Sequence, residues 1–191
     1  WVTISPTRIN PFHSVRTKLL ASLVLVIGAA FYLVAGAIGR GEIRLTGLDP
    51  HSAQGDRAVV EILRDMGADI RWEGSALVSR ASRLHGLRVD CAQIPDLVPI
   101  LAVAMAAAEG DSRITGAARL RIKESDRLSA MAAALTAAGA DAAELPDGLA
   151  IRGGKTLHAA KIEGCNDHRI VMAMTIASAL SDGEWTITDA E

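Results

Sequence analysis

The sequence has few aromatic residues, few cysteines and no excess of charge of either sign. Its 191 residues include six aromatic side chains (three Trp, one Tyr, two Phe), and 20 Lys and Arg stand against 22 Asp and Glu. Without a basic excess the chain lacks long-range attraction to phosphate backbones or anionic lipid, so we expect no nucleic-acid partner. Cys91 and Cys165 have no partner at metal-ligand spacing, which argues against a zinc site or disulfide scaffold and favours a cytoplasmic setting.

Apolar residues make up half of the chain, which is enough for a sizeable core in one domain or two small ones. The uncharged stretch from Leu19 to Gly39 is flanked by Arg16, Lys18 and Arg40, as a membrane-spanning helix would be. It also fits a buried helix preceded by a strand, because Gly28 separates an aliphatic run from an alanine-rich one. Hydropathy alone therefore leaves membrane association through Leu19–Gly39 as an alternative to a cytoplasmic domain.

One short pattern recurs three times along the chain. It consists of Gly, an acidic residue, two variable residues, an aliphatic residue and Thr, and it occupies residues 41–46, 110–115 and 183–188. Each copy reads as a strand and follows an alanine-rich apolar helix, predicted over 29–38, 97–108 and 170–180. Nearly uniform apolar character indicates that these helices are buried.

The first two copies continue in the same way. Each is followed by a second helix ending in Gly-Ala-Asp, predicted over 63–69 and 135–141, and then by a strand–turn–strand run over 71–79 and 142–152. This order predicts an α/β fold of repeated βαββαβ units, with apolar helices inside a ring of sheets. The third unit stops at Glu191 and is expected to be incomplete.

Polar residues gather where the helices are predicted to begin. Asp, Asn or Ser stands at an N-cap position within residues 54–57, 94–96, 123–127 and 166–169. Lys123, Arg127 and Arg169 lie near first turns, where the helix macrodipole disfavours positive charge, and Lys123 and Arg127 share a face if the helix reaches that far. A bound anion would stabilise these cations. The alternative is that the neighbouring acids neutralise them at solvated helix ends, namely Glu124, Asp126 and Asp167.

Asp96 and His168 each have a structural and a functional interpretation. An Asp that follows Pro usually caps a helix, but in a cleft Asp96 would be a carboxylate able to accept a hydroxyl proton. A single His is usually structural, yet His168 beside Arg169 can hydrogen-bond or protonate a substrate. Related helix ends of a repeated unit face a common cleft, so we expect these side chains to converge. Four other histidines show no pattern and receive no role: His13, His51, His85 and His158.

Three segments resemble, in order and spacing, motifs of the 5-enolpyruvylshikimate-3-phosphate (EPSP) synthase family. They are Ile94-Pro95-Asp96, residues 121–128 (RIKESDRL) and Asn166-Asp167-His168-Arg169, and the similarity runs from about Ala30 to Glu191. The UDP-N-acetylglucosamine enolpyruvyl transferases share the fold of that family but differ at the second segment. The resemblance implies a domain of three βαββαβ units, one of two that close over the substrates.

The same resemblance implies an activity and three catalytic positions. The family transfers the enolpyruvyl group of phosphoenolpyruvate to the 5-hydroxyl of shikimate 3-phosphate in aromatic amino acid biosynthesis, with no metal and no cofactor. Asp96 corresponds to the proton acceptor that contacts the shikimate hydroxyls. Lys123 corresponds to the lysine near that hydroxyl and the shikimate phosphate ester. Glu124 corresponds to the acid that moves a proton at the phosphoenolpyruvate methylene.

Phosphoenolpyruvate binding is implied for the remaining positions. Arg127 and Arg169 correspond to the arginines that hold it, and His168 to the histidine beside them; planar guanidinium groups bind carboxylate or phosphate bidentately. Residues 1–28 match no family segment, so we expect an unmatched leader there and the domain over 29–191. The family's second domain has no counterpart here, so we expect a fragment that is inactive alone. The alternative is a non-catalytic or membrane-tethered remnant with at most weak anion binding.

Overall fold

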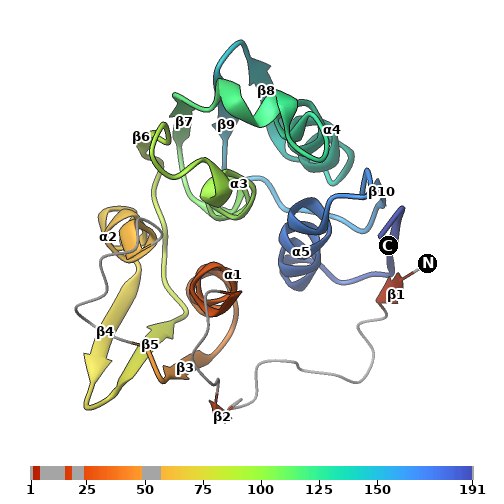
Figure 1. Ribbon diagram of the computed structural model, residues 1–191. Helices are drawn as coiled ribbons and strands as arrows, with labels where there is room; N and C mark the ends of the chain where they lie inside the picture. Colours follow the sequence, from red (N-terminus) through yellow and green to blue (C-terminus); the bar gives the residue numbers. More distant parts are fainter. Residues whose placement is uncertain (1, 5–15, 19–23, 49–56, 191) are drawn as a thin grey trace.

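Three apolar helices stand side by side at the centre of the computed structural model, which describes residues 2–4, 16–18, 24–48 and 57–190 (Figure 1). They are α1 (Val24–Ile38), α3 (Val98–Ala107) and α5 (His168–Ala177). Two more helices, α2 (Ala58–Asp65) and α4 (Arg127–Ala137), pack outside them. Three short 3-10 helices complete the helical elements described: η2 (Pro95–Leu97), η3 (Ala118–Ile122) and η4 (Ser178–Leu180).

Three sheets surround the central helices and repeat one topology. The first, in order β2-β3-β5-β4, consists of Arg16–Lys18, Glu42–Thr46, Ala76–Arg80 and Asp69–Glu73. The second, in order β6-β7-β9-β8, consists of Arg88–Asp90, Asp111–Thr115, Gly148–Arg152 and Asp141–Leu145. In both, the first pair is parallel and the other pairs are antiparallel.

The third sheet is formed by β1 (Val2–Ile4), β11 (Trp185–Thr188) and β10 (Lys161–Glu163), in the order β1-β11-β10. β10 and β11 are parallel, and β1 is antiparallel to β11, so the first three positions of the other sheets are reproduced. This confirms the predicted α/β fold of repeated βαββαβ units.

Small side chains explain how the central helices approach one another. Nine residues of α3 are fully buried, among them Ala102, Ala104 and Ala106, and alanine leaves room for neighbouring backbones. β3, β7 and β11 bury alternate residues, as Ile43 and Leu45 do in β3, because successive side chains point to opposite faces. The core thus lies between the helices and the inner faces of the sheets.

Two predicted boundaries of the outer helices are wrong. α2 ends at Asp65 and α4 at Ala137, so neither reaches the Gly-Ala-Asp sequence that follows. Gly67 and Gly139 have φ of +96° and +92°, a left-handed conformation that stops a helix and that glycine adopts without steric cost. The Asp residues predicted to end these helices instead begin β4 and β8.

α1 passes straight through Gly28, so the strand predicted before it is wrong at residues 24–27, which are helical. The helix has 15 residues, fewer than the roughly 20 needed to cross a hydrocarbon core. Within the ranges that the structure describes, no helix combines the length and apolar character of a membrane span. Residues 19–23 of the candidate segment lie outside those ranges.

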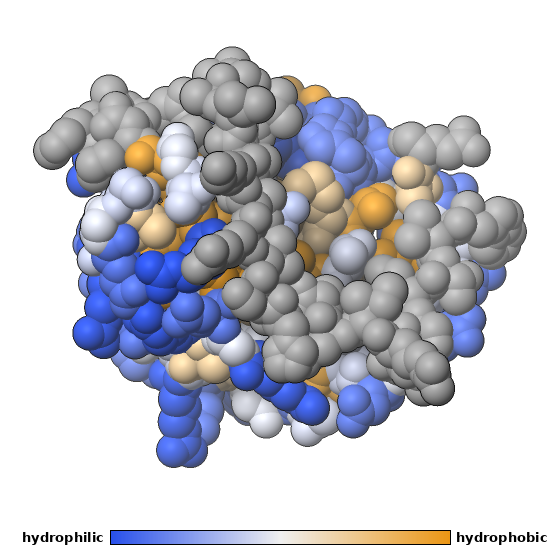
Figure 2. Space-filling model, turned by 90° about the horizontal axis from the view of Figure 1, so that it is seen from below, coloured by the Kyte–Doolittle hydropathy of each residue, from blue (hydrophilic) through white to orange (hydrophobic). Residues whose placement is uncertain are grey.

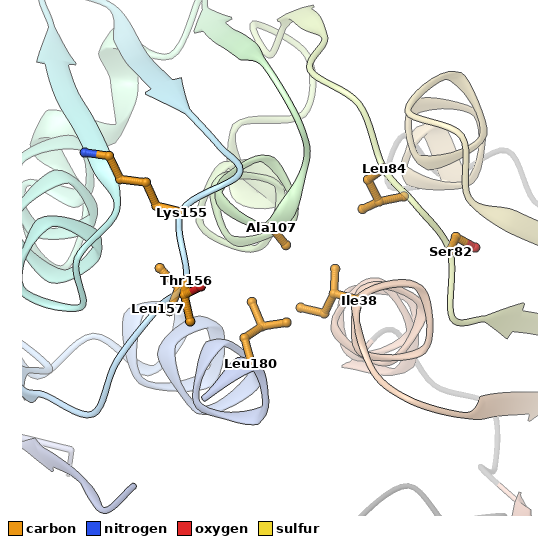
Figure 3. Close-up of a pocket in the computed structure, with 8 residues that line it drawn as sticks. All are labelled: Ile38, Ser82, Leu84, Ala107, Lys155, Thr156, Leu157 and Leu180. Carbon is orange, nitrogen blue, oxygen red and sulfur yellow. The ribbon is translucent and has the colours of Figure 1, made fainter. Parts of the chain in front are cut away.

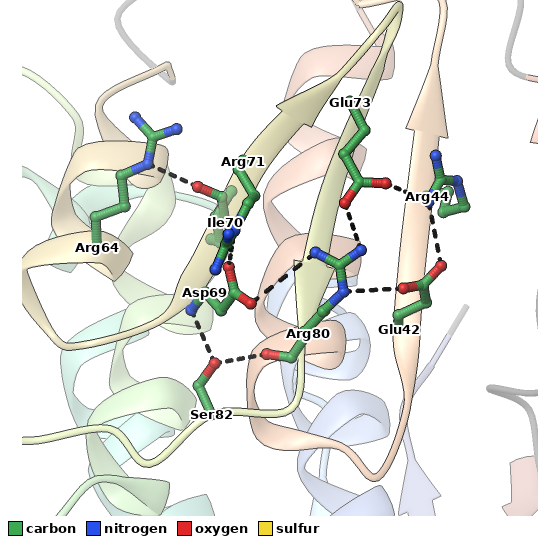
Figure 4. Close-up of polar contacts among 9 residues, drawn as sticks. All are labelled: Glu42, Arg44, Arg64, Asp69, Ile70, Arg71, Glu73, Arg80 and Ser82. Atoms are coloured by element: carbon green, nitrogen blue, oxygen red, sulfur yellow. Dashed lines mark hydrogen bonds and ion pairs between the residues drawn. The ribbon is translucent and has the colours of Figure 1, made fainter.

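The first sheet carries a ladder of ion pairs on the face turned away from α1 (Figure 4). Arg44 contacts Glu42 (3.3 Å) and Glu73 (2.7 Å), and Arg80 contacts the same two acids and Asp69. These side chains are about one third exposed, and every charge drawn has an opposite partner. Seen from below the view of Figure 1, the lower left of the molecule is largely hydrophilic, and hydrophobic areas elsewhere are interrupted by hydrophilic ones (Figure 2). This ladder is a solvated sheet surface.

Two histidines without an assigned role occupy equivalent places in the repeat. The backbone N–H of His85 donates to Met66 (2.8 Å) and that of His158 to Ala138 (3.0 Å), each at the end of an outer helix. Each also stands three residues before a strand, β6 or β10. The expectation that they show no pattern is therefore wrong for this pair. His13 precedes β2 by the same spacing but lies outside the described residues.

A cavity of about 200 Å³ lies at the C-terminal ends of the central helices (Figure 3). Ile38, Ala107 and Leu180 line it, and each stands three residues before the Gly of its copy of the repeat. Leu84 and Leu157 add further apolar surface. Ala107 is the smallest of the three equivalent residues, so it leaves space that the other two copies fill.

We predict that Ala107→Leu fills this cavity and raises the free energy of unfolding by about 0.5–2 kcal/mol, as cavity-filling substitutions commonly do. The matched control is Ala106→Leu, because Ala106 is 1% exposed and does not line the cavity. Overpacking there should lower the free energy of unfolding by about 1–3 kcal/mol. Urea denaturation of both variants measures the difference, and equal destabilisation would contradict the prediction.

Candidate active site

The N-terminal ends of α3, α4 and α5 meet, and their polar side chains form one connected cluster. Asp96 lies in η2, the turn that leads into α3. Arg127 begins α4, and Asp167 is the N-cap of α5. His168 and Arg169 are the first two residues of α5. The convergence of helix starts that the sequence predicted is therefore observed.

Arg127 lies at the centre of the cluster with only 2% of its side chain exposed. Its Nε donates to Asp167 (2.6 Å), its NH1 to Asp96 (3.0 Å) and its NH2 to Glu124 (3.2 Å). Burial acts to lower the pKa of Arg127, but the hydrogen bond that it donates to Asp167 and the charges of the three carboxylates outweigh it, and the net pKa lies above its ordinary value. Arg127 therefore remains a buried cation.

Asp167 is fully buried, and donors surround its carboxylate. Oδ1 accepts the backbone N–H of Arg169 (3.0 Å), which caps α5, and Oδ2 accepts Arg127 Nε and the Ser125 hydroxyl (3.0 Å). Burial acts to raise the pKa of Asp167, but the hydrogen bonds from Arg127, Arg169 and Ser125 and the charge of Arg127 hold it below its ordinary value.

A strained turn delivers Asp167 to this place. Cys165 and Asn166 both have positive φ, 55° and 50°, a conformation uncommon for residues other than glycine. The turn is held by Asn166 N–H to Asp189 O (2.9 Å) and Asp167 N–H to Gly164 O (2.9 Å). Such strain costs about 1–3 kcal/mol per residue and concentrates at functional sites.

Asp96 does not cap a helix, so the capping interpretation of this residue is wrong. Neither η2 nor α3 has a side-chain cap, because the 3-10 turn beginning at Pro95 places Asp96 inside the turn. Its Oδ1 accepts from Arg127, and its Oδ2 lies 3.5 Å from Arg169 NH2. Arg169 NH1 also donates to the backbone carbonyl of Asp96 (3.3 Å). The Asp96 carboxylate thus lies between two guanidinium groups.

Glu124 and His168 form the more exposed side of the cluster. His168 Nδ1 lies 3.0 Å from Glu124 Oε2, and their side chains are 61% and 48% exposed. A proton held between an imidazole and a carboxylate at this distance can pass to a bound molecule. The pair therefore has the geometry of an acid–base site.

Lys123 is exposed and makes no hydrogen bond or ion pair with the residues that the structure describes. α4 begins at Arg127, after Asp126 caps it by accepting from Ser129 N–H (3.2 Å). Lys123 is thus outside the helix, and the predicted face shared with Arg127 does not form. Lys123 lies at the edge of the cluster.

Arg121 anchors the loop that carries Lys123 and Glu124. Its guanidinium donates to the carbonyls of Pro146 (3.0 Å) and Leu145 (2.7 Å) at the β8–β9 turn. It also contacts the carboxylates of Asp126 (3.0 Å) and Glu144 (2.6 Å). Asp126 therefore neutralises Arg121, whereas Glu124 and Asp167 neutralise Arg127.

Glu124, Asp167 and His168 place possible metal-ligand atoms within 4.8 Å of one another. Asp167 already accepts three hydrogen bonds, and one of its oxygens is bonded to the Arg127 cation. A metal ion there would be repelled by Arg127 and would have to displace these donors. The group is better explained as part of the ion-pair cluster.

The cysteines take no part in this chemistry. Cys91 and Cys165 are both free, and burial raises the pKa of the Cys91 thiol to about 12. Burial also raises the pKa of Cys165. Nucleophilic reactivity needs a thiolate, so neither residue is activated.

Five of the six predicted site residues are joined in the cluster, and Lys123 lies beside it. The prediction omitted Asp167 and Ser125 as site residues. Asp167 stood out in the sequence as an N-cap, but its bond to a side chain 40 residues away left no local signal. The cluster contains two arginines and three carboxylates, which are joined by hydrogen bonds and ion pairs.

Most of this chain is similar in sequence to known proteins. A family model described as EPSP synthase (3-phosphoshikimate 1-carboxyvinyltransferase) matches residues 26–191. The 3-phosphoshikimate 1-carboxyvinyltransferase of Ruminiclostridium cellulolyticum is 45% identical over 163 residues, and that of Clostridium novyi is 47% identical over 149 residues. The alignments cover 85% and 78% of this chain.

A solved structure of EPSP synthase from Acinetobacter baumannii aligns with a TM-score of 0.73, at 33% identity over 86% of this chain and 41% of that one. The enolpyruvyl transferase NikO from Streptomyces tendae aligns over 86% of this chain and 38% of its own with a TM-score of 0.70; at 20% identity it shows a common fold alone. The chain spans 38% and 34% of the two curated relatives above, well under half of their length.

We predict that Asp167→Asn lowers the free energy of unfolding at neutral pH by about 3 kcal/mol, because it leaves a buried guanidinium without its closest counter-charge. The pKa of Asp167 is lowered in the folded state, so its contribution is present above the unfolded value of about 3.9 and is lost as pH falls through the folded value. The difference between wild type and variant should therefore shrink on acidification below about pH 4.

Urea denaturation at neutral and acidic pH measures this difference. The control is Asp111→Asn, whose carboxylate and partner Arg152 are both mostly exposed. It should stay within about 1 kcal/mol of wild type at neutral pH. An Asp167→Asn variant as stable as this control would show that the buried pair contributes little.

Proposed function

The chain belongs to the EPSP synthase family, and on this basis we propose that it forms one domain of an enzyme that transfers the enolpyruvyl group of phosphoenolpyruvate to the 5-hydroxyl of shikimate 3-phosphate. The observation that carries the proposal is the buried cluster in which Arg127 and Arg169 flank the carboxylate of Asp96. Two converging guanidinium groups at helix N-termini suit a small polyanion. We propose Arg127, Arg169 and His168 as phosphoenolpyruvate ligands.

The proposed reaction needs an acid and a base on either side of one carbon. Glu124 protonates the methylene carbon of phosphoenolpyruvate, and positive character develops at the neighbouring carbon. The 5-hydroxyl oxygen forms a bond to that carbon while Asp96 takes its proton. Glu124, a carboxylate after its first step, then takes a proton back from the new methyl group as the carbon–oxygen bond to phosphate breaks, which restores the double bond and releases phosphate.

Lys123 is assigned to the shikimate side of the site. Its ammonium is exposed, so it is available to a partner that approaches from outside the cluster. We propose that it lies near the 5-hydroxyl and the phosphate ester of shikimate 3-phosphate. A flexible stem and a compact charge suit a contact made only when substrate is bound.

We propose residues 29–191 as the enolpyruvyl transferase-like domain and residues 1–28 as a leader, whose strands β1 and β2 pair with β11 and β3 of that domain. The region that relatives have and this chain does not span would supply the rest of the shikimate 3-phosphate site. Closure of the two parts would expel water and strengthen the contacts made by the arginines. We therefore expect binding of phosphoenolpyruvate without turnover by the isolated chain.

Calorimetric titration of the 191-residue chain with phosphoenolpyruvate tests the proposal. We predict that Arg169→Gln weakens binding at least about tenfold, because a buried charged partner of the anion is lost. The matched control is Arg152→Gln, because Arg152 is an exposed arginine on β9 that pairs with Asp111, and this variant should bind as wild type does. If wild type, Arg169→Gln and Arg152→Gln bind phosphoenolpyruvate with equal affinity, Arg169 is not part of the proposed site. Phosphate release by the chain alone would refute the expected lack of turnover.

A further inference from the structure

We infer that the three carboxylates around Arg127 divide into one permanent partner and two exchangeable ones. Asp167 is a positioning residue that holds the guanidinium in place, whereas Asp96 and Glu124 occupy the two nitrogens that phosphoenolpyruvate takes over on binding. The inference rests on the proposed function, and it names which contacts of the free site are broken when the anion arrives.

Burial and contacts identify Asp167 as the permanent partner. It is 0% exposed and bonds to Nε, the nitrogen on the stem side of the guanidinium, through the shortest of the three contacts (2.6 Å). The same carboxylate caps α5 and accepts from Ser125, so its rotation would break three hydrogen bonds at once. A buried carboxylate with these partners has no route to solvent.

Asp96 and Glu124 differ from Asp167 in that they are partly exposed and each contacts a second basic side chain. Their side chains are 33% and 48% exposed, and they contact the terminal nitrogens NH1 and NH2 at 3.0 and 3.2 Å. Asp96 also faces Arg169, and Glu124 also faces His168. Asp96 can leave Arg127 without becoming an unpaired charge, because Arg169 is already within contact distance. Glu124 keeps His168 Nδ1 as a hydrogen-bond partner at 3.0 Å.

The exchange would free the two terminal nitrogens of Arg127 for a carboxylate or phosphate group. Departure of Asp96 and Glu124 exposes two parallel N–H donors on adjacent terminal nitrogens, the fork that binds a carboxylate or phosphate bidentately. Until then these two acids compete with the incoming anion for Arg127. The residues proposed to transfer protons therefore also weaken anion binding by the free site.

Asp96→Asn and Glu124→Gln provide the test, because each removes a competing charge from a partly exposed position. We predict that each variant binds phosphoenolpyruvate about 3- to 10-fold more tightly than wild type, whereas Asp167→Asn binds about tenfold more weakly. Glu61→Gln is the matched charge control, since Glu61 is exposed and paired with Arg64 on α2. It should leave the dissociation constant unchanged.

Hydrogen exchange of the Arg127 Nε proton, followed by NMR and assigned with Arg127→Lys, gives a readout without ligand. Protection should persist in Asp96→Asn and Glu124→Gln and fall in Asp167→Asn. Ser125→Ala, which removes one donor to Asp167, should lower protection partially and serves if Asp167→Asn does not fold.

The outcomes separate this inference from the proposed function. If wild type binds phosphoenolpyruvate but Asp96→Asn and Glu124→Gln bind it no more tightly, the exchange is refuted and the proposed function stands. If neither wild type nor any variant binds phosphoenolpyruvate, both are refuted. Equal loss of Nε protection in all three carboxylate variants would refute the distinct role of Asp167.

Discussion

A buried guanidinium must have counter-charges, and this constraint organises the whole polar end of the molecule. Arg127 is almost completely enclosed, and removal of an arginine from water is tolerated only when its donors are satisfied. Its three partners come from η2, from the loop before α4 and from the start of α5. The ion pairs therefore tie together segments 31 and 40 residues apart, and the strained turn at Cys165 and Asn166 is maintained because it delivers Asp167 to this cation.

The repeated unit supplies the geometry in which that constraint can be met. The alanine-rich helices pack closely, and in two successive copies the inner helix is followed by the same strand order. The N-terminal ends of the inner helices therefore lie at one end of the molecule and their C-terminal ends at the other. The polar cluster forms at the N-terminal ends, whereas the cavity beside Ala107 forms at the C-terminal ends. The charged side chains at one end of the molecule are paired, whereas the apolar side chains at the other end leave a cavity. Substitutions at the first end therefore change the site, and substitutions at the second change only packing.

Local signals in the sequence were sufficient for the three inner helices, for the strands that follow them and for two of the caps. The Gly-acid-x-x-aliphatic-Thr pattern predicted β3, β7 and β11, and Asp126 and Asp167 cap as expected. The capping interpretation of Asp96 was wrong because the 3-10 turn at Pro95 has no clear local signature. The helix face that Lys123 would share with Arg127 does not form because α4 begins only at Arg127. Glu124 and Asp167 stood out in the sequence as neighbouring acids able to neutralise Arg127, as they do. Its pairing with Asp96 was not predicted, since it depends on which helix ends come together in three dimensions.

The two interpretations offered for the charged helix ends are not exclusive. Glu124 and Asp167 do neutralise Arg127, as the structural interpretation required, yet the pairing leaves Asp96 and Glu124 partly exposed and each in contact with a second cationic or protonatable group. A site that binds a polyanion must keep its cations satisfied while empty, because a buried unpaired arginine would destabilise the fold. In the proposed reaction, Asp96 and Glu124 transfer protons and are already at the reacting position when the anion displaces them from Arg127. Under that proposal, the stability of the free site and the chemistry of the substrate-bound site rest on the same residues, and only Asp167 serves stability alone.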